Sequence, residues 1–134
     1  MAGPMFTTQE EAATLLIVDD EPHILSAMRR SLRHEGYELL LAQGPVAALD
    51  WLDQRRIDLV LCDQMMPGMR GVQLLGEVAR MQPGAARLLI TGGGDDRLDR
   101  DLDRLGLPEP LTKPWEDAEL KETLRKALAQ VRSD

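Results

Sequence analysis

Residues 15–22, Leu-Leu-Ile-Val-Asp-Asp-Glu-Pro, decide the fold more than any other stretch of the chain. A run of apolar residues without polar interruption is typical of a strand that is buried on both faces. The proline that follows suits the first turn of a helix, where its missing N–H would have no partner. The apolar residues after it recur at helical spacing, at Ile24, Leu25, Met28 and Leu32. This stretch therefore predicts a buried strand, an acidic turn and an amphipathic helix.

The same alternation continues to the end of the chain. Further strands are expected at 37–42, 59–62, 87–90 and 110–112, and further helices at 46–55, 71–81, 97–105 and 116–131. Strands that alternate with helices predict an α/β domain with a five-stranded parallel sheet and helices on both faces. The first, third and fourth strands are apolar enough for the centre of the sheet. The fifth contains proline, which cannot donate to a ladder, so it is expected at an edge.

A chain of 134 residues fits a single domain. We expect a loose N-terminal tail at 1–13, one domain at 14–131 and a short C-terminal tail at 132–134. No apolar run approaches the ~20 residues of a membrane span, and no segment reads as a signal peptide. The lone cysteine, Cys62, lies in an apolar run, which favours a buried thiol in a reducing cytoplasm.

The charge distribution argues against a nucleic-acid surface. The formal net charge is −7, and arginines are interspersed with carboxylates, as in residues 95–101, Asp-Asp-Arg-Leu-Asp-Arg-Asp. Phosphate backbones require a basic patch, and such a mixed run is usually a solvated helix face. We therefore expect no direct contact of this chain with nucleic acid and none with a membrane.

Polar side chains follow four of the five expected strands, at the point where each strand ends. Asp19 and Asp20 follow the first strand, Asp63 the third, Thr91 the fourth and Lys113 the fifth. Each has an ordinary explanation alone, such as a helix-start acid or a surface lysine. Because the carboxyl ends of parallel strands share one edge, where α/β sheets bind ligands, we expect all five to converge.

Such a cluster needs a cation. Two carboxylates about 4 Å apart repel by roughly 4 kcal/mol at an effective dielectric constant near 20. A hard divalent ion relieves this repulsion, and an all-oxygen site with few protein ligands suits Mg²⁺. Two cations beside a carboxylate nucleophile are what phosphoryl transfer to an aspartate requires.

Four motifs resemble the receiver domain of two-component response regulators, of the chemotaxis-regulator type. They are Leu-Leu-Ile-Val-Asp-Asp-Glu at 15–21, Asp-Gln-Met-Met-Pro-Gly-Met at 63–69, Leu-Ile-Thr-Gly at 89–92 and Leu-Thr-Lys-Pro-Trp at 111–115. The intervals also match, with 43 residues from Asp20 to Asp63, 28 to Thr91 and 22 to Lys113. Each motif alone is weak, but the ordered set covers about 14–131 and implies a flavodoxin-like (βα)₅ fold.

The resemblance assigns a role to each residue of the cluster. Asp63 is implied as the phosphoacceptor. Asp20, Asp63 and the backbone carbonyl of Met65 are implied as direct Mg²⁺ ligands, while Asp19 acts mainly through water. Lys113 pairs with the phosphoryl oxygens.

Two further features follow from the same resemblance. Thr91 turns inward to hydrogen-bond the phosphoryl group once it is present. The peptide bond between Lys113 and Pro114 is expected to be cis, a geometry that is realistic only before proline.

The resemblance also implies partners. A histidine kinase, a phosphotransfer protein or a small acyl phosphate would donate the phosphoryl group, and the domain would catalyse its own modification and slow hydrolysis without turning over a free metabolite. A downstream protein or output domain would read the face made by the fourth helix, fifth strand and fifth helix. A homodimer through that face is one arrangement that the resemblance allows.

One departure from the family keeps an alternative open. The family usually has an aromatic residue three positions before the lysine, where this chain has Pro110. The glycines at 92–94 could let backbone movement replace the swing of that ring. Without the ring, a phosphorylation-independent interaction module is a credible alternative. An aspartate-nucleophile hydrolase is less so, because Met65 stands where that class needs a second aspartate.

Four aromatic or histidine residues and Arg70 have ordinary structural explanations that compete with functional ones. His23 and His34 are expected to be exposed rather than phosphorylated, because phosphohistidine signalling needs a helical bundle. Trp51 is expected near the core. Trp115 is more easily explained by packing than by partner recognition. Arg70 stands where the family often has aspartate, and it is explained by loop variation.

Overall fold

A computed structural model of the chain describes residues 12–133. The expected N-terminal tail lies outside the described residues except for Ala12 and Ala13. Ala13 is buried, and its carbonyl accepts a hydrogen bond from the N–H of Glu38 at 2.9 Å. The described structure therefore includes the last two residues of the expected N-terminal tail, and the final helix continues to Ser133, within the expected C-terminal tail.

Five strands alternate with five helices along the described chain. The strands are β1 (Thr14–Val18), β2 (Glu38–Ala42), β3 (Leu59–Asp63), β4 (Ala86–Thr91) and β5 (Leu111–Thr112). The helices are α2 (Pro22–Leu32), α3 (Pro45–Gln54), α4 (Gly71–Met81), α5 (Asp96–Leu105) and α6 (Asp117–Ser133). The predicted α/β alternation is confirmed, with boundaries displaced by one or two residues at most ends.

All strand pairs in the sheet are parallel, and the strand order is β2-β1-β3-β4-β5. The three most apolar strands, β1, β3 and β4, occupy the centre, as their sequences predict. β5 lies at an edge and has only two residues, because Pro110 falls outside the ladder. The chain reverses direction across the sheet between β2 and β3, which is the topology of the flavodoxin-like fold.

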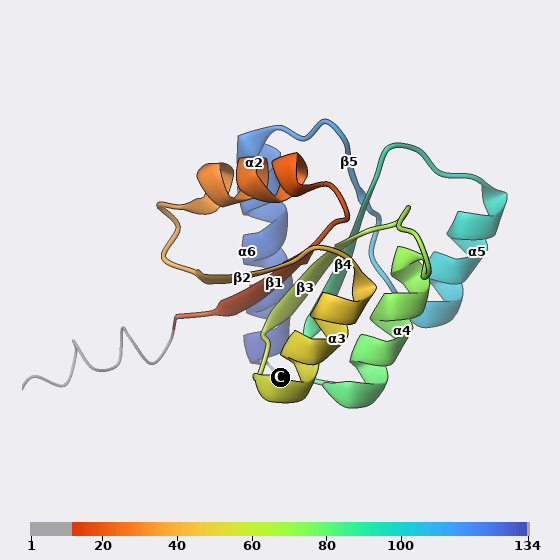
Figure 1. Cartoon of the computed structure of the whole chain (residues 1–134), viewed down its shortest axis with the longest axis horizontal. Coiled ribbons are helices and arrows are strands. Elements are labelled where there is room, and N and C mark those ends of the chain that lie inside the picture. The colour runs from red at the N-terminus through yellow and green to blue at the C-terminus, as the bar shows by residue number, and fades with distance from the viewer. Residues whose placement is uncertain (1–11, 134) are drawn as a thin grey trace, which may run out of the picture.

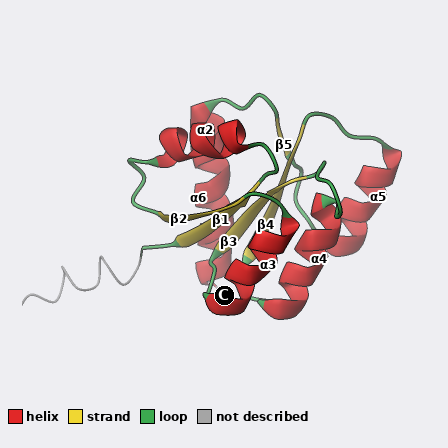
Figure 2. Ribbon diagram, viewed as in Figure 1, coloured by secondary structure: helices red, strands yellow, loops and turns green. Residues whose placement is uncertain are grey.

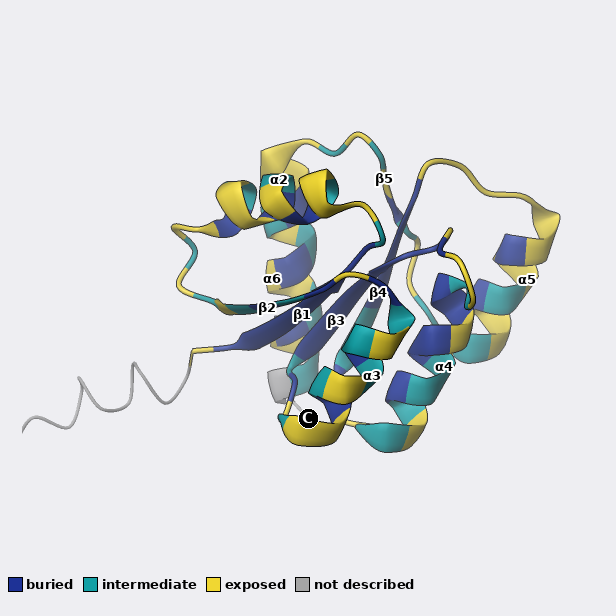
Figure 3. Cartoon of the chain, in the orientation of Figure 1, coloured by how far each residue is buried: buried dark blue, intermediate teal, exposed yellow. Residues whose placement is uncertain are grey.

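Helices cover both faces of the sheet (Figure 1; Figure 2). α2 and α6 pack on one face through a cluster that includes Leu25, Met28 and Leu124. α3, α4 and α5 pack on the other through a cluster that includes Leu75 and Leu102. β1 and β3 are buried along their whole length, as the dark strands of Figure 3 show. None of the helices in the described part of the chain combines the length and apolar character that crossing a membrane requires.

Gln82 joins three segments at the amino-terminal edge of the sheet. Its side-chain amide donates to the carbonyls of Leu52 and Arg55 at 2.9 and 2.7 Å, and its Oε1 accepts from the N–H of Ile57 at 2.8 Å. This one side chain thus satisfies the backbone at the end of α3 and the start of the connection to β3. The edge of the sheet opposite the acidic cluster is held by direct hydrogen bonds.

Gly71 is the point where α4 approaches β3 most closely. A Cβ atom at this position would lie against the backbone carbonyl of Asp63, 2.8 Å from Leu89 Cδ1 and 2.9 Å from Gln64 Cα. Two of these neighbours are backbone atoms, which cannot turn aside as a flexible side chain can. Only glycine lets α4 begin directly beneath the carboxyl end of β3.

Gly71→Ala is expected to destabilise the domain by about 1–3 kcal/mol, because it forces a contact that the backbone cannot relieve. Urea unfolding followed by circular dichroism measures this change. The matched control is Gly76→Ala in the same helix, where an added Cβ meets nothing within 4 Å. The control should be neutral or stabilising by up to about 1 kcal/mol, since alanine is the better helix former. Equal stability of the two variants would contradict the close approach.

Candidate functional site

The parallel sheet brings the polar strand ends to one edge. Asp63 and Thr91 are the last residues of β3 and β4, and Asp19 and Lys113 directly follow β1 and β5. β1 and β3 are neighbours, as are β3 and β4, and β4 and β5. Asp19, Asp63 and Thr91 are all buried, at 1%, 4% and 4% exposure. Buried carboxylates at a strand end need a cationic partner.

Lys113 is that partner. Its Nζ lies 2.8 Å from Asp19 Oδ2 and 3.3 Å from Asp63 Oδ1, so these two oxygens are at most about 6 Å apart. At this separation two carboxylates repel by about 3 kcal/mol at an effective dielectric constant near 20. The shared ammonium compensates this repulsion, and the structure therefore brings Asp19, Asp63 and Lys113 into one cluster.

The surroundings shift the protonation of these groups. Burial raises the pKa of Asp63 above its ordinary value, and the Asp19 carboxylate raises it further, while Lys113 and the backbone N–H of Met65 partly offset the rise. Burial alone would lower the pKa of Lys113, but its hydrogen bonds and charge interactions with both carboxylates raise it above the ordinary value. Burial, with the two carboxylates, also raises the pKa of the Cys62 thiol, so Cys62 is an inert apolar group.

A second acidic group adjoins the first. Asp19, Asp20 and Glu21 each offer a carboxylate oxygen within 4.8 Å of the others. The backbone N–H of Glu21 donates to Asp19 Oδ1 at 2.9 Å, which folds the acidic turn back on β1. Glu21 was not predicted as a site residue, although it continues the Asp-Asp run. Asp63 is not a member of this group, and in the described chain its carboxylate is paired with Lys113 instead.

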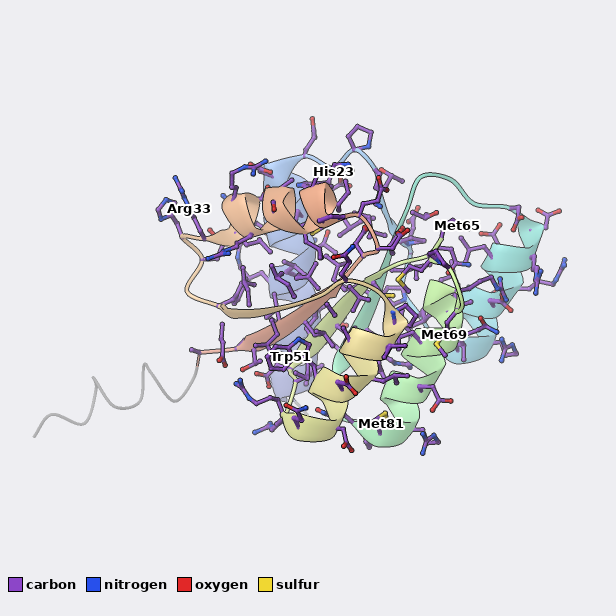
Figure 4. All side chains as sticks on the ribbon, viewed as in Figure 1. His23, Arg33, Trp51, Met65, Met69 and Met81 are labelled. Atoms are coloured by element: carbon purple, nitrogen blue, oxygen red, sulfur yellow. The ribbon has the colours of Figure 1, made fainter. Side chains whose placement is uncertain are left out.

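The loop after β3 is built around Gln64, a residue for which the sequence pattern predicts no role. Gln64 is buried, its Oε1 accepts from the N–H of Val72 at 3.0 Å, and its carbonyl accepts from the N–H of Gly71 at 2.9 Å. These bonds tie the loop to the start of α4. The next residue, Met65, is 70% exposed and points away from the core (Figure 4). The backbone of this loop is therefore held close to Asp63 while its outer side chains face solvent.

Thr91 has a local partner. Its hydroxyl donates to the carbonyl of Gly93 at 2.6 Å and accepts from the N–H of Gly93 at 3.2 Å. The Thr91 carbonyl accepts from the N–H of Lys113 at 2.9 Å, which links β4 to the start of the Lys113–Pro114 segment. The peptide bond before Pro114 is cis.

The two histidines and the two tryptophans lie as their structural explanations predict. The His23 side chain is 73% exposed, beside Glu21, and points away from the domain (Figure 4). His34 is also exposed. Trp51 packs against the core and donates its indole N–H to the Leu41 carbonyl at 3.0 Å, and Trp115 donates to Ser31 Oγ at 3.3 Å.

Comparison with known proteins agrees with this geometry. Residues 15–125 match the response regulator receiver domain family, and the chain belongs to that family. This is a family of signalling switches and not of metabolic enzymes. The resemblance predicted from the four sequence motifs is thus confirmed, as is the flavodoxin-like fold.

Individual relatives span both regulators and isolated receiver domains. The hydrogenase transcriptional regulatory protein HoxA of Bradyrhizobium diazoefficiens is 34% identical over 89% of this chain and 24% of its own length. A signal receiver domain of an HD domain-containing protein from Pseudomonas fluorescens superposes with a TM-score of 0.88 at 32% identity, over 92% of this chain and all of the other.

A third relative carries a ligand. The response regulator protein TrrA of Thermotoga maritima, solved in complex with Mg²⁺-BeF, superposes with a TM-score of 0.75 at 32% identity, over 86% of this chain and 98% of its own. The chain spans about a quarter of the length of the transcriptional regulators it matches.

Lys113→Met is expected to destabilise the metal-free domain by about 3–5 kcal/mol at neutral pH, because it leaves two buried carboxylates without their cation. Adding Mg²⁺ should restore part of this loss. Thermal or urea unfolding in EDTA and in Mg²⁺ measures both effects. Lys121→Met is the control, because Lys121 makes only a 3.8 Å pair with Glu35, and it should cost less than about 1 kcal/mol. Similar losses for both lysines would contradict the central role of Lys113.

Asp63→Asn should change how stability depends on pH. The folded-state pKa of Asp63 is raised, so its contribution to stability is present at low pH and is lost as pH rises through that pKa. The variant cannot ionise here, so its stability relative to wild type should increase between about pH 4 and neutral pH. Urea unfolding in EDTA across this range provides the measurement. A difference in unfolding free energy that stays constant with pH would show that burial and Asp19 do not raise the pKa of Asp63.

Proposed function

We propose that this receiver domain accepts a phosphoryl group on Asp63 from a phosphorylated histidine of a kinase or phosphotransfer protein, or from a small acyl phosphate. The observation that carries this proposal is the pairing of a buried Asp63 with Asp19 through Lys113 at the carboxyl edge of the sheet. That arrangement supplies a carboxylate nucleophile with fixed positive charge beside it. Regulators related by sequence and fold support the same role.

The transfer itself is a single displacement at phosphorus. An Asp63 carboxylate oxygen forms a bond to phosphorus while the bond from phosphorus to the donor nitrogen or oxygen breaks, and the donor leaves with that electron pair. The ammonium of Lys113 pairs with the phosphoryl oxygens as charge develops on them. It is already within 3.3 Å of the nucleophile, so little rearrangement is needed.

The donor set at this edge fits Mg²⁺. Asp20 and Asp63 would hold the ion together with the backbone carbonyl of Met65, and Asp19 would act through water. All are oxygen ligands, and the close acidic group formed by Asp19, Asp20 and Glu21 favours a divalent cation. When bound, Mg²⁺ neutralises charge on the phosphoryl oxygens and aligns them with the nucleophile.

Thr91 would change its hydrogen-bond partner when Asp63 is phosphorylated. To hydrogen-bond a phosphoryl group, its hydroxyl must leave the Gly93 carbonyl and N–H, which it contacts at 2.6 and 3.2 Å. Release of Gly93 frees a loop whose glycines at 92–94 are exposed. Movement of this backbone replaces the swinging aromatic that Pro110 cannot provide.

A second candidate is an interaction module that keeps the fold but signals without phosphate. Pro110 in place of the family aromatic favours it, because the usual route from Thr91 to the edge strand is missing. Both candidate functions would use the partner-binding face at α5, β5 and α6. They differ in whether Asp63 accepts a phosphoryl group.

Incubation with acetyl phosphate and Mg²⁺ should add one phosphoryl group to the intact protein, as measured by mass spectrometry. Asp63→Asn should abolish the addition, because it removes the nucleophile. The matched control is Asp53→Asn, since Asp53 is exposed on α3, and it should react like wild type. EDTA should suppress the reaction in both reactive proteins.

Failure of the unmodified protein to gain a phosphoryl group would favour the interaction module. Addition that persists in Asp63→Asn would place the acceptor elsewhere.

A further inference from the structure

A hollow of about 480 Å³ opens between α5 and β5, within the ~300–1,000 Å³ range of ligand pockets. Its apolar lining comes from Leu98 and Leu102 on α5 and from Leu107 and Pro110 on the segment that follows. Leu98 and Leu102 are buried, while Leu107 and Pro110 are half-buried. The small proline ring at 110 lies where a large aromatic side chain would occupy space. An apolar surface of this kind is therefore left open to solvent.

The charged residues that line this hollow all have the same sign. They are Asp99, Asp103 and Glu109, each exposed, and no lysine or arginine lines the hollow. None of the three forms an ion pair with another described residue. Three uncompensated carboxylates therefore surround an apolar floor.

The opposite side of α5 is different. There Asp101 lies 3.1 Å from Arg104 and 3.4 Å from Arg70. A hydrogen bond from Arg104, helped by Arg70, lowers the pKa of Asp101 below its ordinary value. α5 thus has one acid, Asp101, paired within the domain, and two acids without an ion pair in the described chain, Asp99 and Asp103, beside the hollow. The asymmetry points to an external cation at the hollow.

We propose that this hollow binds a basic segment of a partner protein, which inserts one large apolar side chain against Leu98, Leu102 and Pro110. Lysine or arginine side chains flanking it pair with the surrounding carboxylates. This segment would belong to the downstream partner that binds the face made by α5, β5 and α6. The proposal rests on the proposed function only in one respect, that binding should depend on phosphorylation.

Other occupants fit the hollow less well. A two-fold dimer centred on the hollow would bring the negative charges of both copies close together, because both copies present the same surface. Nucleic acid would meet uncompensated negative charge. The charge pattern therefore favours a basic polypeptide over both.

The wall of the hollow connects it to the acidic site. Thr91 and Gly93 line the hollow as well as sharing their hydrogen bonds with each other. When Thr91 turns toward a phosphoryl group, Gly93 loses this partner and the wall changes shape. The affinity for the basic segment should therefore differ between the free and the phosphorylated domain.

A short fluorescein-labelled peptide with one phenylalanine flanked by arginines is a suitable probe. Fluorescence polarisation with the full chain should detect binding, and amide NMR shifts should concentrate at Gly93, Leu98 and Leu102. Asp99→Arg or Asp103→Arg should weaken binding by about tenfold or more, because each reverses a charge at the hollow. Asp53→Arg makes the same change on exposed α3 and should leave the affinity within about twofold of wild type.

Matched peptides separate the two parts of the interaction. Replacing phenylalanine by alanine should weaken binding, since the apolar floor loses its occupant, and replacing the arginines by glutamates should abolish it. Adding Mg²⁺ and beryllofluoride should change the affinity of the original peptide by several-fold if the wall responds to Thr91.

Several results would overturn the proposal. They are equal losses in Asp53→Arg and Asp99→Arg, indifference to the loss of phenylalanine, amide shifts away from the hollow, or association of the chain with itself through the hollow without peptide. The peptide is first tested on the unphosphorylated domain. A failure of acetyl phosphate labelling therefore leaves this result standing, and a failure of peptide binding leaves the phosphoacceptor role standing.

Discussion

The ammonium of Lys113, placed between Asp19 and Asp63, is the interaction on which the site depends. Parallel strands deliver both carboxylates to the same edge, where burial and the neighbouring Asp19 raise the pKa of Asp63. β5 need be no longer than two residues, because its task is to carry Lys113 back over that edge. The sheet, its strand order and the short last strand can all be understood as means of bringing one cation to two acids.

Most of this architecture was predictable from the chain itself. Apolar runs such as Leu59 to Cys62 identify central strands, because a strand covered on both faces has no polar side. Helical spacing in 71–81 gives α4 with its observed bounds. The convergence of Asp19, Asp63 and Lys113 follows from one rule, that the carboxyl ends of parallel strands share an edge. Long-range proximity could be inferred here because the topology imposes it.

Other features depend on side-chain geometry that periodicity does not contain. Glu21 joins the acidic group because the turn after β1 folds back through its own N–H. Nothing in the spacing distinguishes Gln64 from an exposed loop residue, although its buried amide organises the loop after Asp63. The run at 95–101 predicts a solvated helix face, and it does not reveal that Asp101 is paired with arginines while Asp99 lies at an apolar hollow.

The three hydrogen bonds of Gln82 have a mechanical consequence. They link the end of α3 and the entry to β3 to the end of α4, so one side chain cross-links three segments at the amino-terminal margin of the sheet. At the opposite margin, Gly93 is held by its two hydrogen bonds with the Thr91 hydroxyl. Because the amino-terminal margin is cross-linked, we expect a change at Thr91 to be accommodated at the glycine turn 92–94 and the first residues of α5.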